Sequence, residues 1–193
     1  MDPDQIATGL AVLIRLYLGD ELDEGQRTAF MAILPIIERV LVLHPEHPHL
    51  ARLASGLFRK VRQLDEAVEL ARRSYELSPD PDTAVYLGYA YREQGDFGSA
   101  RSAFEAALEL APERLDIQSD FGWLLWLMGQ PDEAIRRLQA VVDIDPDHAW
   151  AFPNLCYFHC LHEQDERWFH RLKRYFAAHP QNDLAAHWLQ ELY

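Results

Sequence analysis

Apolar residues recur three and four positions apart through most of the chain, which is the spacing of one face of an α-helix. The blocks come in pairs, such as 84–91 followed by 100–107. A short turn signal separates the two blocks of that pair, Gln94-Gly95-Asp96. Glycine at such a turn can take the left-handed conformation that ends a helix. The pattern predicts an all-α chain built from helical hairpins.

A proline recurs at an almost constant interval and marks the end of each hairpin. The steps between successive prolines are 34, 33, 34 and 34 residues. A fixed period in this range is typical of helical repeat arrays. Proline cannot continue a helix, so we expect each second helix to end just before it. The five prolines are Pro45, Pro79, Pro112, Pro146 and Pro180.

Small residues occupy two recurring positions inside the units, Gly88 with Ala100 and Gly122 with Ala134. They allow the two helices of a hairpin to approach closely. With the larger apolar residues between them, these units resemble the tetratricopeptide repeat. The resemblance implies a right-handed superhelical array of antiparallel helix pairs.

The resemblance divides the chain into a series of units that we expect to form one domain over 1–193. Repeats are clear in the middle and irregular at both ends, because a terminal repeat with no neighbour must cover its own apolar face. In the fourth repeat Cys156 replaces the small glycine and Trp168 replaces a small alanine, so we expect that pair to be splayed or differently packed. The units are an atypical N-terminal hairpin over 1–47, clear repeats over 48–80, 81–114 and 115–148, a degenerate repeat over 149–181 and a capping helix over 182–193.

Composition excludes several classes of partner. The net charge of −13 disfavours nucleic acid, which needs basic surface to displace counterions, and it disfavours anionic membranes. No run reaches the ~18 apolar residues of a membrane span. Asp2, Asp4 and Arg15 are unlike a secretory signal, and Cys156 and Cys160 lie one helical turn apart, as expected of reduced thiols. The sequence predicts a cytoplasmic protein without membrane insertion.

The resemblance also implies a binding surface, because the first helices of such repeats line a concave groove that holds a peptide or helix of a partner. One half of the predicted groove is basic in an otherwise acidic chain, and arginine pairs well with carboxylates. The other half is aromatic, and aromatic side chains often carry binding energy. The alternative is that the arginines are solvated and that the tryptophans pack between repeats or under the last helix. The predicted groove residues are Arg52, Arg59, Lys60, Tyr89, Arg92, Trp123, Trp126, Trp150 and Tyr157.

Catalytic and metal chemistry find little support. The chain has no phosphate loop, no GxSxG elbow and no HExxH helix, so we expect no enzyme and no cofactor. Cys156, His159 and Cys160 could hold zinc at helical spacing, but paired ligand knuckles are missing. A core histidine beside free thiols is the preferred interpretation, and no metal site is predicted.

Two functions remain open at this point. The first is a monomeric adaptor or chaperone-like scaffold that holds a segment of a protein partner. The second is a structural assembly subunit that self-associates through its irregular ends, for which the aromatic C-terminal stretch with Trp168 and Trp188 is the supporting feature. A monomer is expected over a homodimer.

Overall fold

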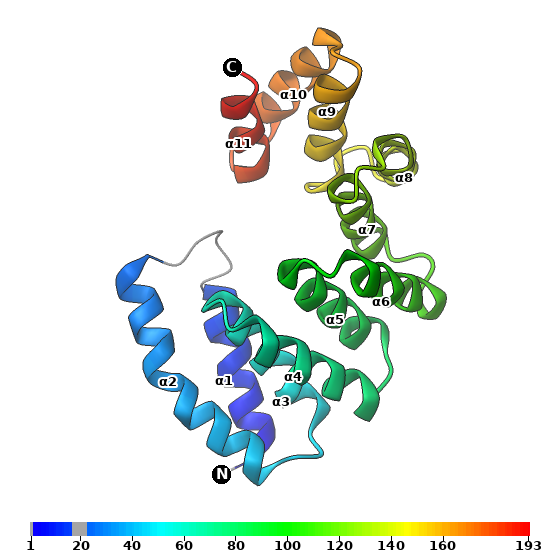
Figure 1. Cartoon of the computed structure of the whole chain (residues 1–193). Helices are drawn as coiled ribbons and strands as arrows, with labels where there is room; N and C mark the ends of the chain where they lie inside the picture. Colours follow the sequence, from blue (N-terminus) through cyan, green and yellow to red (C-terminus); the bar gives the residue numbers. More distant parts are fainter. Residues whose placement is uncertain (1, 17–22) are drawn as a thin grey trace. The chain divides into compact units, whose positions relative to one another are not determined.

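Helix is the one regular element in the part of the chain that the structure describes. The structure is a computed structural model, and it describes residues 2–16 and 23–193. Eleven helices follow one another in this part, and short turns join them from α2 onward (Figure 1). The chain divides into two compact units, Met1–Ala111 and Pro112–Tyr193. The all-α class expected from the spacing of apolar residues is confirmed.

The first unit contains six helices. The helices α3 and α4 form one antiparallel pair and α5 and α6 form the next, and α3 also packs against α5. The N-terminal helices α1 and α2 both pack on α3. Most of the predicted long connection over 19–25 lies outside the described residues. The six helices are α1 (Pro3–Leu16), α2 (Glu24–Leu43), α3 (Pro48–Lys60), α4 (Leu64–Leu77), α5 (Pro81–Gln94) and α6 (Phe97–Leu110).

The second unit contains five helices. Two more pairs, α7 with α8 and α9 with α10, are followed by a single last helix that contacts both α9 and α10. Asn182 caps this helix, since its Oδ1 accepts the Ala185 backbone N–H at 2.8 Å. The helices are α7 (Leu115–Leu127), α8 (Pro131–Ile144), α9 (Ala151–His162), α10 (Glu166–Ala178) and α11 (Asp183–Glu191).

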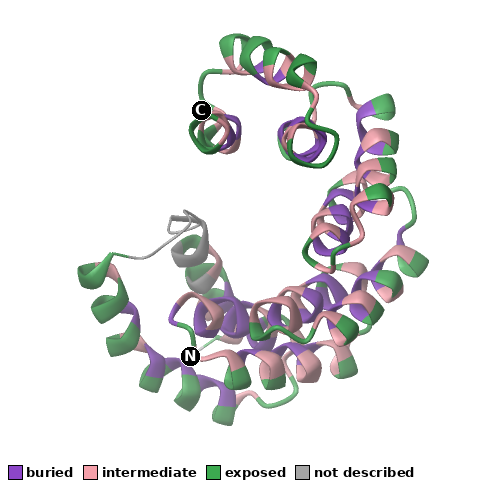
Figure 2. Cartoon of the chain, turned by 45° about the horizontal axis from the view of Figure 1, so that its top comes forward, coloured by how far each residue is buried: buried purple, intermediate pink, exposed green. Residues whose placement is uncertain are grey.

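The recurring prolines stand where the sequence pattern places them. The second helix of each hairpin ends two residues before its proline, as α4 does at Leu77 before Pro79 and α8 at Ile144 before Pro146. The turn inside the second clear repeat uses Gly95 at φ 90°, the left-handed conformation that closes α5. These turns reverse the chain within each hairpin, so buried sides of neighbouring helices face one another (Figure 2).

Close approach within the hairpins explains the small residues. A Cβ added at Gly88 would lie 2.9 Å from Phe104 Cε2, and one added at Gly122 would lie 2.9 Å from Leu138 Cδ2. Phe104 and Leu138 are themselves fully buried. Glycine at these two positions therefore makes room for a large core side chain from the facing helix.

The degenerate fourth repeat keeps its helix pair by filling the interface differently. Cys156, in place of the small glycine, is completely buried in α9. Trp168 of α10 stacks on the ring of His159 with centroids 3.9 Å apart and planes 5° apart. Arg171 lies over the same indole, with its Cζ 3.9 Å from the centroid of Trp168. A group of three planar side chains thus takes the place of the usual small-residue contact.

Candidate protein-binding faces

The basic half of the predicted groove lies in the first unit, on α3 and α5. We call Arg52, Arg59, Lys60, Tyr89 and Arg92 the arginine face. Two of its guanidinium groups converge on one ring, since Arg59 Cζ lies 5.0 Å and Arg92 Cζ 5.1 Å from the centroid of Tyr89. Each such contact contributes about 0.5–1 kcal/mol at exposed sites and more when desolvated. The tyrosine therefore orders both arginines.

Arg59 also has an ion-pair partner inside the chain. Its Nε donates to Glu93 Oε1 at 3.0 Å, and a terminal N–H of the same guanidinium reaches the same oxygen. The Arg59 side chain is 16% exposed and that of Glu93 is 24% exposed, so the pair is partly shielded from water. Glu93 thus offsets the positive charge of Arg59, which was predicted to bind a partner. The separation of 34 residues between the two is one repeat, which is the sequence signal for this pairing.

Arg52 is held by a second aromatic ring and by a histidine. Its Cζ lies 4.7 Å from the centroid of Tyr86, and its Nη2 lies 2.8 Å from His49 Nδ1. Burial, followed by the positive charge of Arg52, lowers the pKa of His49 below its ordinary value. A neutral imidazole can accept the guanidinium N–H, whereas an imidazolium cannot. Lys60 ends α3 beside Arg59 and is half-buried.

The aromatic half of the predicted groove lies in the second unit, and the chain itself uses much of it. The rings of Trp126, Phe158, Trp123, Trp188 and Tyr157 form a connected series that we call the aromatic stack. Trp126 lies flat on Phe158 with centroids 4.0 Å apart, and Trp123 lies 5.6 Å from the same ring. Phe158 is fully buried, so these contacts join α7 to α9.

The last helix completes the aromatic stack from the other side. Trp188 of α11 lies on Tyr157 with centroids 4.0 Å apart and on Trp123 with centroids 5.7 Å apart. Its indole N–H donates to Asn154 Oδ1 at 2.9 Å. Packing under the last helix was the alternative left open for the tryptophans. Trp123 does pack against the last helix, and so does Tyr157. Trp150 is different, because it precedes α9 as its N-cap residue and is 37% exposed.

Sequence reasoning thus placed Trp123, Trp126 and Tyr157 in one region, but it missed Phe158 and assigned Trp188 to the aromatic C-terminal stretch and not to the aromatic stack. Phe158 falls at a position that the repeat pattern does not single out. Trp188 lies 34 residues after Asn154, which is one repeat, and this spacing is the sequence signal for their contact. Whether either face binds a partner stays a prediction.

The thiols and histidines of α9 do not assemble into a ligand set. In the described chain, no three His, Cys, Asp or Glu side chains are arranged to hold a metal ion. Cys156 and Cys160 are free thiols. Burial raises the pKa of Cys156 to about 12 and also raises that of Cys160. Both thiols are therefore protonated and poorly nucleophilic near neutral pH. None of the helices described is both long and apolar enough to cross a bilayer.

Repeated helix pairs with a period of 34 residues and glycine-mediated close approach define an α-helical repeat protein. A family model for the tetratricopeptide repeat matches residues 91–152. The protein TTC0263 of Thermus thermophilus superposes with a TM-score of 0.73 at 18% identity, over 95% of this chain and 96% of that one. The chain therefore has the fold of tetratricopeptide repeat proteins, and residues 91–152 match the family's repeat.

Two further matches extend the comparison. The tetratricopeptide repeat protein YrrB, whose structure is described as having an unusual peptide-binding site, superposes with a TM-score of 0.61 at 22% identity, over 83% of each chain. The transcriptional regulator HilA of Salmonella typhimurium is 28% identical over 104 residues, which is 53% of this chain. The chain spans 19% of the length of HilA. Fold and family together support a repeat scaffold for protein–protein interaction.

Proposed function

We propose that the protein is a non-catalytic binding scaffold whose arginine face takes an acidic segment of a partner protein. The observation that carries the proposal is the convergence of Arg59 and Arg92 on Tyr89. Guanidinium groups bind carboxylates through two parallel N–H donors, which gives direction as well as strength. A reducing cytoplasm suits the two free thiols, and an adaptor or chaperone-like role suits the fold.

Pre-ordering supports the proposal energetically. An exposed arginine loses side-chain entropy when a partner immobilises it, at a cost of about 0.5–1.5 kcal/mol per side chain. Tyr86 and Tyr89 already restrict three arginine side chains in the unbound chain. Less entropy therefore remains to be lost on binding. The region also lacks the acidic excess of the whole chain, since residues 48–80 carry six bases and five acids while the net charge of the chain is −13.

The exposed rings of the second unit support a further part of this proposal. Trp150 and the accessible side of Trp126 offer apolar contact to a second part of the partner. Trp123 and Tyr157 are less available because Trp188 stacks on both. The apolar contribution is therefore expected from Trp126 and Trp150.

The test uses fluorescence anisotropy with a fluorescein-labelled peptide of about twelve alternating acidic and small residues, and with a lysine peptide of the same length. The variant Arg52→Glu, Arg92→Glu is expected to weaken binding of the acidic peptide by at least about tenfold. Arg27→Glu, Arg39→Glu is the matched control, because it makes the same charge change at two exposed positions of α2.

A third variant tests the role of the internal ion pair. Glu93→Gln removes the competitor of Arg59, so the acidic peptide is expected to bind more tightly than to the parent. Equal affinity of the parent, the arginine-face variant and the control for the acidic peptide would refute the proposal. Circular dichroism confirms that each variant is folded.

A further inference from the structure

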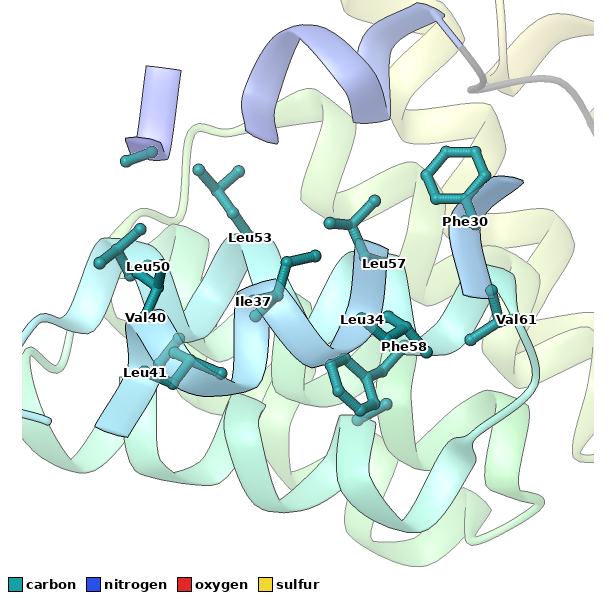
Figure 3. Packing of buried hydrophobic residues seen from close by; sticks show 14 residues of the cluster. Phe30, Leu34, Ile37, Val40, Leu41, Leu50, Leu53, Leu57, Phe58 and Val61 are labelled. Carbon is teal, nitrogen blue, oxygen red and sulfur yellow. The ribbon is translucent and has the colours of Figure 1, made fainter. Parts of the chain in front are cut away.

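A second surface of the first unit lies between α2 and α4. Leu41 of α2, Phe58 of α3 and Leu70 of α4 give it an apolar floor, and its volume is about 450 Å³. We call it the α2–α4 cleft. Figure 3 shows how α2 is seated on α3 through Leu34, Ile37 and Leu41, with Phe58 beside Leu34.

Val42 is an unusual residue at the edge of this cleft. It is 77% exposed. It lies three residues before Pro45, and the residues three before the next three recurring prolines are Glu76, Glu109 and Asp143. Three second helices therefore place a carboxylate in water at this position, and α2 places an isopropyl group there. Burying that group against a partner would favour binding, because it removes apolar surface from water.

Acidic side chains surround the apolar floor. They are Glu38 of α2 and Asp65, Glu66 and Glu69 of α4, and no lysine or arginine is among the described lining residues. Asp65 accepts a hydrogen bond from Gln94 Nε2 at 2.7 Å, and Glu69 pairs with Arg72.

Two of the four acidic side chains are available to pair with a basic ligand. Within the described chain, Glu38 and Glu66 have neither a hydrogen-bond nor an ion-pair partner for their carboxylates. An apolar floor with an acidic border is complementary to a ligand that has an apolar face bordered by basic residues. Acidic lipid headgroups and acidic peptides are repelled by it.

We propose that the α2–α4 cleft docks a basic amphipathic helix of a partner protein. Helices bind grooves between helices by placing residues at i, i+3, i+4 and i+7 on an apolar floor. Such a helix would set leucine-type side chains on Leu41, Val42 and Leu70, with flanking lysine or arginine near Glu38 and Glu66. This surface and its ligand chemistry are independent of the arginine face, which takes the opposite charge.

The probe is a fluorescein-labelled peptide of about sixteen residues, made of leucine, lysine and alanine with leucine on one helical face. A shuffled peptide of the same composition lacks that face. A third peptide has glutamate in place of lysine. Anisotropy titrations of the full chain are expected to show binding of the first peptide, with affinity falling as salt rises. The shuffled and acidic peptides are expected to bind at least about tenfold more weakly.

The variant Val42→Glu separates burial from charge. It restores the acidic residue type found at three of the four equivalent positions, and it adds one more negative charge beside the basic peptide. Simple attraction to an acidic protein would make this variant bind more tightly. The docking proposal requires it to bind at least about tenfold more weakly, because the apolar edge is lost.

A charge reversal provides the second arm. Glu38→Lys, Glu66→Lys is expected to weaken binding of the basic peptide by at least about tenfold, whereas Glu109→Lys, Glu113→Lys, which makes the same change at two exposed positions outside the cleft, stays within about twofold of the parent. Unchanged affinity in both Val42→Glu and the cleft reversal overturns the proposal. So does a dimer in sedimentation velocity that Val42→Glu converts to monomer, because a second copy would then be the occupant.

Discussion

Trp188 of the last helix and Asn154 of α9 form a hydrogen bond of 2.9 Å between the indole N–H and Oδ1. The two residues are 34 positions apart, one repeat, and both are buried. The same tryptophan stacks on Tyr157, so α11 is held by one polar contact and by ring packing together. A short helix of nine residues gains its position from this pair of contacts.

Replacing Trp188 with Phe is expected to keep a ring on Tyr157 and to leave Asn154 Oδ1 without its donor. An unpaired buried acceptor costs about 1–3 kcal/mol in the free energy of unfolding. Urea unfolding followed by tryptophan fluorescence measures this in the second unit alone, because all five tryptophans lie at or after Trp123. In an Asn154→Leu background the same substitution is expected to cost less, since no acceptor remains. Equal costs in both backgrounds would show that the hydrogen bond does not stabilise the unit.

Gly88→Val is expected to destabilise the first unit by about 1–3 kcal/mol through overpacking. A Cβ there already lies 2.9 Å from Phe104 Cε2, and that ring is fully buried. Gly98→Ala is the control, because its added Cβ meets nothing closer than 3.6 Å. Thermal unfolding followed by circular dichroism compares the two. Equal melting temperatures would mean that Phe104 moves aside freely.

Cys160 is expected to react with iodoacetamide before Cys156 in the folded protein. Burial raises the pKa of Cys156 to about 12, so at about pH 8 its thiolate fraction is on the order of one in ten thousand. Raising the pH by about two units increases the thiolate of both residues but leaves Cys156 mostly protonated. Mass spectrometry after timed alkylation measures the order, and protein unfolded in urea should label at both sites. Labelling of folded Cys156 at the unfolded rate would contradict its burial.

Acidification is expected to weaken the first unit through His49. Burial and the charge of Arg52 lower its pKa, so the unfolded chain takes up a proton at a higher pH than the folded chain. Stability is therefore lost as pH falls below about 6.5, the ordinary value, and is regained above it. Melting temperatures measured from about pH 7.5 down to about 5.5 test this against His49→Gln, in which the loss should be smaller. The same pH dependence in both proteins would exclude His49 as a cause.

The sequence by itself determined the helix pairs and their limits. Proline removes a backbone donor and clashes with the preceding turn, so Pro79 and Pro146 end their helices locally, whatever the rest of the chain does. Glycine is compatible with a left-handed φ without strain, which explains why Gly95 could be recognised as a helix end. Gly88 and Gly122 could be recognised for a different reason. Only a residue without a side chain lets the two helices of a hairpin approach so closely.

Only the tertiary structure decided how the candidate side chains are used. Arg59 and Trp123 both carry long side chains whose partners depend on rotamers and on residues far along the chain. Glu93 reaches Arg59 across the contact of α3 with α5, and Trp188 reaches Trp123 because α11 packs on α9. The opening beside Val42 likewise depends on how α2 is seated on α3. Local spacing specifies which face of a helix is apolar, but packing between helices decides which of those side chains remain available to a partner.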